Sequence, residues 1–335
     1  MRDLLYVILL LLLTLVSCKE TIMSSDPANT PVSNFEVLWN DFDRFYSHFS
    51  YNNVDWDSIY HHYRPQINNK TTDRDLYEIF KEMMLGLEDG HVNLYHSPFP
   101  YFGYYPWDNR PNNFNRSILG TYYLEQLEIR ENFVSGIIEN RVGYLHIATW
   151  IDSYSFKTAS NILESMKSLD AIIVDVRDNG GGNNLLLKHI VQHFTDDRIP
   201  YMRYRYRNGP DHDDFTGWRT AKTTPGAYEA FQKPVFVLTN RSCASTTEDF
   251  ILAMRQLPQV TVVGDTTAGS SGNPITRELP NGWAFRLSRW QQVDANFNHF
   301  EGVGLVPDIP VWITPEEEAA NRDTMIDTVL NRMEI

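Results

Sequence analysis

The chain has few cysteines and a deficit of basic residues. Only two of its 335 residues are cysteine, and they do not give the cysteine–histidine spacing of a zinc site. Lysine and arginine number 29 against 43 acidic residues, and the formal net charge of -14 argues against nucleic acid as a partner. The sequence also lacks a phosphate-binding loop and a dinucleotide fingerprint. We therefore expect no cofactor, no metal and no nucleic-acid partner.

The N-terminal hydrophobic run is short. Residues 4–16 are apolar, which is too few to span a bilayer comfortably. The run ends in Leu15-Val16-Ser17-Cys18, which resembles a bacterial lipobox. This resemblance implies a lipoprotein signal peptide over 1–17 and lipidation of Cys18; an ordinary signal peptide or an uncleaved anchor helix is the alternative. Only Cys243 would then remain, which excludes an internal disulfide.

Lipidation of Cys18 would determine the location of the protein in a bacterial cell. Residues 18–33 are small, polar and contain proline, so we expect a flexible tether there. Several acyl chains on Cys18 give stable anchoring, where one chain is marginal. The expected location is the cell envelope, on the periplasmic or surface face of the outer membrane.

The rest of the chain can form a substantial core, because 42% of the residues are hydrophobic and 13% are aromatic. Between Phe35 and Tyr46, apolar residues recur every three or four positions, which indicates a helix. Further helices are expected over 57–63 and from Thr72 to Leu87. We predict an N-terminal helical subdomain over 34–95. An aromatic connecting segment follows over 96–141. Its first part, 96–118, is rich in proline and either irregular or offers a carbohydrate-stacking surface, and strand-like segments are expected near 120–138.

Residues 142–335 are predicted to form an α/β core. The unbroken apolar run 171–176 is typical of a parallel strand covered on both faces. Helical patterns over 155–168 and 185–194 flank it, and the strand–helix alternation continues through 234–256 to a strand at 260–264. At the C-terminal end, Thr314 followed by Pro315 marks the start of another helix.

Three separated features could carry chemistry. Ser245 follows the apolar run 235–238 at a strand-to-helix turn, where a nucleophile is exposed near backbone N–H groups; it also forms a capping-box pattern with Glu248. His91 directly follows Gly90 at an element boundary, where a histidine is either structural or a general base. The glycines 180–182 form either a tight turn or a loop whose N–H groups face a developing negative charge.

Two other histidine groups are weaker candidates. Asp211-His212-Asp213-Asp214 could bind a divalent ion, but a solvated acidic loop fits the pattern better. His61 and His62 are adjacent on a predicted helix, where neighbouring side chains diverge and make poor joint ligands.

Five motifs in order resemble the tricorn and C-terminal-processing family of serine peptidases. They lie within about residues 35–330, and they are Leu87-Glu88-Asp89-Gly90-His91, Asp175-Val176-Arg177-Asp178-Asn179-Gly180-Gly181-Gly182, Asn240-Arg241-Ser242-Cys243-Ala244-Ser245-Thr246-Thr247-Glu248, Gly264-Asp265-Thr266-Thr267-Ala268-Gly269 and Glu301-Gly302-Val303-Gly304-Leu305-Val306-Pro307-Asp308. The resemblance implies a crotonase-like or ClpP-like core, a parallel sheet with flanking helices. It also implies a variant without a PDZ domain, since only about 50 residues separate His91 from Gly143.

The resemblance also assigns roles to residues. Ser245 corresponds to the nucleophile, His91 to the tricorn-type general base and Glu301 to the acid at the far end of the tetrad. Backbone N–H groups of Gly181 and Thr246 would form the oxyanion hole, which agrees with the unpaired donors expected at helix N-termini.

The sequence departs from the family pattern at two positions. Where the C-terminal-processing branch has its lysine base, this chain has Ser270, so a Ser/Lys dyad is not expected. Where tricorn has the serine of its tetrad, this chain has Gly90, which has no side chain to orient the base. The connection from Glu301 to His91 is therefore open: it could run through a water, Ser270 or Ser271, or be absent.

The function expected from this resemblance is a serine endopeptidase or peptidase that acts on a peptide or protein substrate. Ser245 would attack the carbonyl carbon, and His91 would accept and return the proton. The alternative is a catalytically inactive relative that binds a peptide or hydrophobic ligand in the same cleft, which the glycine at position 90 favours.

Overall fold

The computed structural model describes residues 26–95, 99–105, 113–151 and 155–335. The expected signal peptide, Cys18 and most of the expected tether lie outside these residues. Within the described part of the chain, every helix is too short or too polar to cross a membrane.

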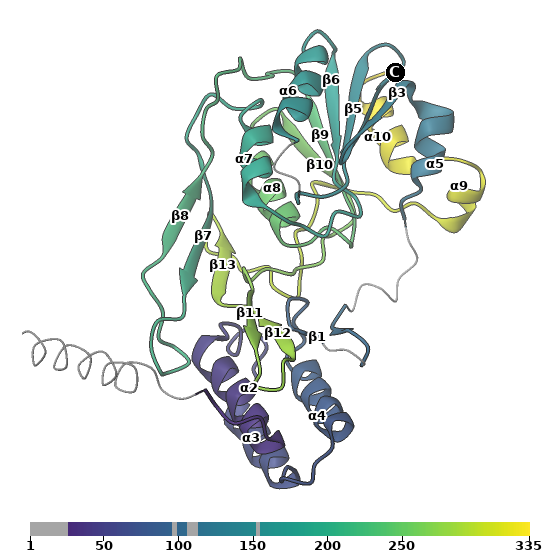
Figure 1. Ribbon diagram of the computed structural model, residues 1–335. Coiled ribbons are helices and arrows are strands. Elements are labelled where there is room, and N and C mark those ends of the chain that lie inside the picture. The colour runs from purple at the N-terminus through teal and green to yellow at the C-terminus, as the bar shows by residue number, and fades with distance from the viewer. Residues whose placement is uncertain (1–25, 96–98, 106–112, 152–154) are drawn as a thin grey trace, which may run out of the picture.

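A seven-stranded sheet forms the centre of the larger lobe, in the order β14-β10-β9-β6-β5-β4-β3 (Figure 1). The strands β5, β6, β9, β10 and β14 are parallel to one another, whereas β4 pairs antiparallel with both β5 and β3. The strand bounds are Glu125–Arg130 (β3), Phe133–Ile138 (β4), Val142–Ile147 (β5), Ala171–Asp175 (β6), Val235–Thr239 (β9), Val260–Gly264 (β10) and Ile309–Pro310 (β14).

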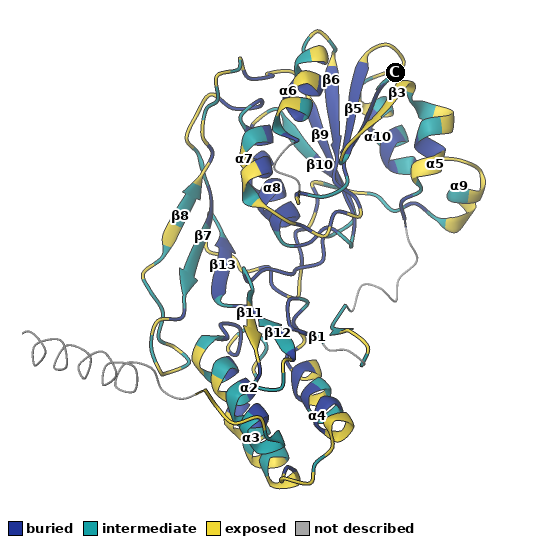
Figure 2. Cartoon of the chain, in the orientation of Figure 1, coloured by how far each residue is buried: buried dark blue, intermediate teal, exposed yellow. Residues whose placement is uncertain are grey.

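Helices cover both faces of this sheet (Figure 1). One face packs against α6 (Phe156–Ser165), α7 (Asn184–Val191) and α8 (Thr246–Met254), and the other against α10 (Thr324–Arg332) and the turn Leu119–Tyr123 after α5 (Arg116–Ile118). The central strands are buried along their whole length (Figure 2), which explains their unbroken apolar sequences. The predicted α/β core with a mostly parallel sheet is confirmed.

A smaller lobe contains the N-terminal helices α2 (Pro31–Phe45), α3 (Trp56–Tyr63) and α4 (Asp73–Leu85), with a short turn at Arg64–Gln66. Thr72 caps α4, because its side chain accepts a hydrogen bond from the Asp75 amide. A four-stranded sheet, β11-β12-β1-β2, packs against these helices and shares their hydrophobic core. Its strands are Asn93–Tyr95 (β1), Phe102–Gly103 (β2), Ile275–Glu278 (β11) and Ala284–Leu287 (β12).

The predicted domain boundaries differ from the observed architecture in two places. The hairpin β3–β4 lies in the main sheet, although it falls within the segment 96–141 that we expected to be a connection. The N-terminal lobe also takes β11 and β12 from residues 275–287, far along the chain. Periodicity along the sequence finds strands but not the partners with which they pair, and this accounts for both differences.

The remaining elements connect the lobes and complete the chain. The strands β7 (Pro200–Tyr206), β8 (Arg219–Lys222) and β13 (Trp290–Asp294) form a three-stranded antiparallel sheet beside the main one (Figure 1). The C-terminal α9 (Pro315–Ala319) begins as the sequence predicts, with the Thr314 side chain accepting from the Glu317 amide at 3.2 Å.

Candidate active site

Two turns at the ends of neighbouring parallel strands form the floor of the site. The turn 176–182 follows β6, and the turn 240–245 follows β9. The Asn240 side chain joins them: its Oδ1 accepts from the Asp178 amide at 3.0 Å, and its Nδ2 donates to Asp178 Oδ1 at 2.7 Å. The carboxyl ends of parallel strands are where open α/β sheets place their binding sites.

Ser245 lies in a strained turn directly before α8. Its φ is 58° and its ψ is -123°, a conformation that residues with a Cβ rarely adopt. The Ser245 amide donates to Glu248 Oε2 at 3.2 Å, which is one half of a capping box. The Ser245 hydroxyl oxygen lies 3.2 Å from His91 Nε2. Cap and nucleophile are therefore compatible roles for this serine.

His91 comes from the smaller lobe, in the turn between α4 and β1. Its backbone amide donates to Asp89 Oδ1 at 2.7 Å, which fixes the turn. Nδ1 of the ring lies 3.1 Å from Ser270 Oγ. The imidazole therefore has one hydroxyl on each nitrogen, Ser245 at Nε2 and Ser270 at Nδ1.

Burial is the main influence on the basicity of His91. Burial lowers the pKa of the imidazole, the Asp89 charge raises it and the Arg286 charge lowers it, and together they bring the pKa to about 4. At neutral pH the ring is thus uncharged and able to accept a proton.

Glu248 organises the loop that carries Ser270. Its Oε1 accepts from the Thr267 hydroxyl and from the Gly269 amide at 2.9 Å, and its Oε2 accepts from the Ser270 amide at 2.9 Å. Burial raises the pKa of Glu248 to about 7, although these hydrogen bonds favour the ionised form. The sequence identified Glu248 only as a capping residue and missed this second contact set.

Glu301 does not contact His91. Its Oε2 accepts from the Ser271 amide at 2.6 Å and from the Ser271 hydroxyl at 2.7 Å. Its Oε1 faces His48 Nδ1, 3.7 Å away. Of the alternatives left open by the sequence, Ser270 contacts the ring of His91 and its neighbour Ser271 contacts Glu301.

Of the two backbone amides predicted to bind the oxyanion, one already donates a hydrogen bond within the described part of the protein and the other does not. The Gly181 amide already donates to Asn179 Oδ1 at 3.0 Å, so it is not free in this arrangement. The Thr246 amide, at the first position of α8, has no acceptor among the described residues. The same is true of the Gly180 amide, which the sequence analysis did not select. Gly180 and Thr246 both line the cavity beside Ser245.

Gly181 has a steric role that only glycine can fill. Its φ is 108°, and a Cβ built there would lie 2.8 Å from Ser245 Cβ and 3.0 Å from Ala244 O. A side chain at this position would therefore push against the residue that carries the reactive hydroxyl.

A cavity of about 990 Å³ opens above Ser245. Its lining is largely polar and includes His91, Gly90, Ser270 and Arg286. Gly90 thus reaches the cavity without a side chain, and Ser270 supplies the hydroxyl beside the imidazole. The volume is within the range of ligand-binding clefts and is large enough for several peptide residues.

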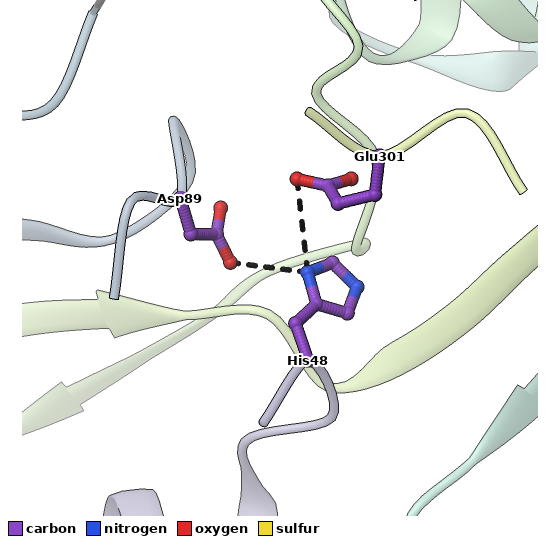
Figure 3. A group of neighbouring side chains, drawn as sticks. All are labelled: His48, Asp89 and Glu301. Carbon is purple, nitrogen blue, oxygen red and sulfur yellow. Dashed lines mark ion pairs between the residues drawn. The ribbon is translucent and has the colours of Figure 1, made fainter. Parts of the chain in front are cut away.

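Within the described residues, one group of histidine and carboxylate side chains is close enough to hold a metal ion. It consists of His48, Asp89 and Glu301, whose ligand-type atoms lie within 4.8 Å of one another. All three residues are buried, and Figure 3 shows the two carboxylates facing the same nitrogen of His48. The weaker candidates from the sequence do not form such a group: His212 pairs instead with Asp43, at 2.8 Å.

Comparisons with known proteins give two matching family models and several relatives. Residues 141–311 match the model of peptidase family S41, and residues 27–85 match that of the tricorn protease C1 domain. The carboxy-terminal processing protease CtpB of Bacillus subtilis is 28% identical over 190 residues, 56% of this chain and 37% of CtpB. The tricorn protease of Thermoplasma acidophilum is 22% identical over 215 residues, 63% of this chain and 18% of that protein.

Similarity to a solved structure extends over nearly the whole chain. The crystal structure of a candidate peptidase from Parabacteroides merdae is 34% identical, with a TM-score of 0.83, and the match covers 90% of this chain and 96% of that one. The chain spans about a third of the length of the first curated relatives that it matches. With half of its residues inside the family model and a solved relative matched over most of its length, this chain belongs to peptidase family S41.

Proposed function

We propose that this protein is a serine peptidase that cleaves peptide bonds of a peptide or protein substrate through Ser245, with His91 as the general base. The observation that carries the proposal is the distance of 3.2 Å between Ser245 Oγ and His91 Nε2. A serine becomes a nucleophile when a base within hydrogen-bond reach takes its proton, and this geometry meets that condition.

The reaction follows from the positions of these groups. Nε2 of His91 accepts the Ser245 proton as Oγ attacks the carbonyl carbon, and the Thr246 amide supports the resulting oxyanion. The imidazolium then protonates the leaving amine as the C–N bond breaks, which leaves an acyl-enzyme. Water, deprotonated by the same nitrogen, hydrolyses the ester and restores the Ser245 hydroxyl.

The reaction needs the His91 tautomer with its hydrogen on Nδ1, and a hydrogen bond to Ser270 can stabilise that tautomer. For Nε2 to accept a proton, the neutral ring carries its hydrogen on Nδ1, where Ser270 Oγ is the acceptor at 3.1 Å. Because residue 270 is a serine, we infer a histidine base in place of a Ser/Lys dyad. The contact between Ser245 and His91 also favours catalysis over the ligand-binding alternative.

Peptide hydrolysis by the purified full chain tests this proposal. An unfolded protein substrate or a pool of quenched fluorescent peptides should be cleaved by the wild type. Ser245→Ala should reduce the rate by roughly 10³-fold or more. Ser117→Ala, which removes an exposed hydroxyl in α5, is the matched control and should retain full activity. Equal rates for Ser245→Ala and the wild type would refute the assignment.

We also infer that lipid attached to Cys18 anchors the protein in the bacterial cell envelope. Support comes from the apolar run that ends in Leu15-Val16-Ser17-Cys18 and from the polar segment that follows it. Cells fed a labelled fatty acid should incorporate the label into the wild type, and Cys18→Ser should abolish incorporation. Label in the Cys18→Ser protein, or none in the wild type, would contradict the anchor.

A further inference from the structure

A buried cluster behind the active site joins three distant parts of the chain. His48 follows α2, Asp89 follows α4, and Glu301 follows β13. Nδ1 of His48 lies 3.2 Å from Asp89 Oδ2 and 3.7 Å from Glu301 Oε1. Figure 3 marks both ion pairs with dashed lines. Nε2 of His48 lies 2.9 Å from the Trp290 carbonyl oxygen. Both ring nitrogens of His48 thus face acceptors.

The other oxygen of each carboxylate connects the cluster to His91. Asp89 Oδ1 accepts from the backbone amide of His91 at 2.7 Å. Glu301 Oε2 accepts from Ser271, whose neighbour Ser270 contacts His91 Nδ1. The contacts therefore form a closed ring from the backbone of His91, through Asp89, His48, Glu301 and the segment 270–271, to the imidazole of His91.

The charges of His48, Asp89 and Glu301 determine whether this closed set of contacts is stable. Two ionised carboxylates that share a buried site repel each other unless a cation or a proton separates them. His48 donates to a carbonyl oxygen through Nε2, so a second proton on Nδ1 makes it the cation. Burial alone would lower the pKa of His48, but the nearby carboxylates of Glu301 and Asp89 raise it to about 9. Burial raises the pKa of Glu301, whereas the charge of His48 lowers it, so the imidazolium favours the ionised carboxylate.

We propose that His48 is a positioning residue for the reaction: its imidazolium holds Asp89 and Glu301 where they fix the backbone and the ring of His91. The inference rests on the proposed function of Ser245 and His91. It gives the segment after α2 a part in the chemistry, beside the turn after α4 that carries His91.

Two neutral variants separate the roles of the two ring nitrogens. In His48→Gln, the side-chain amide reaches toward the Trp290 carbonyl but leaves no donor for the carboxylates. In His48→Asn, the amide lies near the place of Nδ1 and retains that donor. We expect His48→Gln to lower kcat by roughly 10²-fold, since a small misplacement of a catalytic group has an effect of this size. His48→Asn should lower it less, and KM should change little in both.

A control variant and a folding measurement accompany these rates. His62→Gln replaces an exposed histidine on α3 and should match the wild type. A folded His48→Gln protein with wild-type kcat would overturn the inference, yet leave the proposed function intact if Ser245→Ala is inactive. A wild type without activity would instead remove the proposed function itself.

Spectroscopy of the wild type tests the charge of His48 without any substitution. Nitrogen-15 NMR at pH 7 should show one imidazolium that keeps both of its ring protons, with couplings that place it at residue 48. A neutral ring there would overturn the proposal. Elemental analysis of the same sample should find no stoichiometric metal; an equivalent of zinc or another divalent ion would also overturn it, since the three side chains would then be ligands.

Discussion

Ser270 Oγ lies 3.1 Å from His91 Nδ1, the ring nitrogen that does not contact Ser245. The tetrad of tricorn-type peptidases implied a side chain just before the histidine, and here that position is Gly90. The hydroxyl comes instead from a loop that is 179 residues further along the chain. This loop is held by Glu248, three residues after the nucleophile, so one carboxylate connects the turn of Ser245 to the support of its base.

Loss of the Ser270 hydroxyl should slow catalysis without weakening substrate binding. Ser270→Ala leaves Nδ1 of His91 without its side-chain partner, and the ring is then free to rotate or change tautomer. We expect kcat to fall about 10-fold, the equivalent of one hydrogen bond of about 1.4 kcal/mol, with KM unchanged.

Ser271→Ala is the comparison for this variant. It keeps the backbone N–H that donates to Glu301 at 2.6 Å and loses only the hydroxyl contact, so its effect on kcat should be smaller. Steady-state kinetics of both proteins measure the difference, and a larger loss in Ser271→Ala would reverse the assignment.

The pH dependence of kcat/KM should reflect the low basicity of His91. Burial lowers the pKa of the ring to about 4, and the ring must be neutral to accept a proton. Activity should therefore persist below pH 6.5, the ordinary histidine value, and fall as the pH drops through His91's own pKa. An acid limb centred at pH 6.5 or above would count against His91 as the base.

A substitution at Arg286 should shift the acid limb of the pH–rate profile. Its positive charge lowers the pKa of His91, so Arg286→Gln should raise that pKa and shift the acid limb to higher pH. The pH–rate profiles of the two proteins, measured at the same ionic strength, give the shift. A shift to lower pH would contradict the electrostatic account.

Gly181 should tolerate no side chain. Gly181→Ala combines a φ of 108° with a Cβ only 2.8 Å from Ser245 Cβ, so we expect a loss of roughly 1–3 kcal/mol in stability and a large loss of activity. Gly180→Ala is the matched variant, because a Cβ there meets nothing within 4 Å. Denaturant unfolding should show Gly180→Ala close to the wild type; equal destabilisation of both would show that the steric argument is wrong.

Glu248→Gln should weaken the hydrogen bonds that position Ser245 and the loop of Ser270. The carboxylate accepts hydrogen bonds from Ser245, Thr267, Gly269 and Ser270. A glutamine NH₂ would face two of these donors with a donor of its own, which should lower the free energy of unfolding by about 1–3 kcal/mol. Thermal unfolding checks the stability, and labelling rates at Ser245 check the position of the nucleophile. Full retention of both would mean that Glu248 is only a helix cap.

The sequence predicted those parts of this architecture that depend on local patterns. The strand over 260–264 and the cap at Thr314 were found because burial and capping leave a signature within a few residues. Ser245 and His91 were found through motif order, and the structure brings them together.

The parts that sequence reasoning missed depend on contacts between distant segments. Motif position gave Ser270 as one of several possible links to His91 without deciding among them, and nothing near His48 indicates two carboxylates. The Gly181 amide was assigned to an oxyanion from its place in a glycine turn, but the side chain of Asn179 accepts from it. A turn pattern predicts backbone conformation, whereas the acceptor for an amide depends on the fold around it.

The most direct test of the central claim is covalent labelling of the nucleophile. The full-length protein is treated with a fluorophosphonate probe, digested and analysed by mass spectrometry. A peptidase of the kind proposed should carry the phosphonyl group on Ser245, and labelling should disappear in Ser245→Ala and slow in Ser270→Ala. A folded protein without an adduct at Ser245, or with the adduct on another serine, would contradict the account.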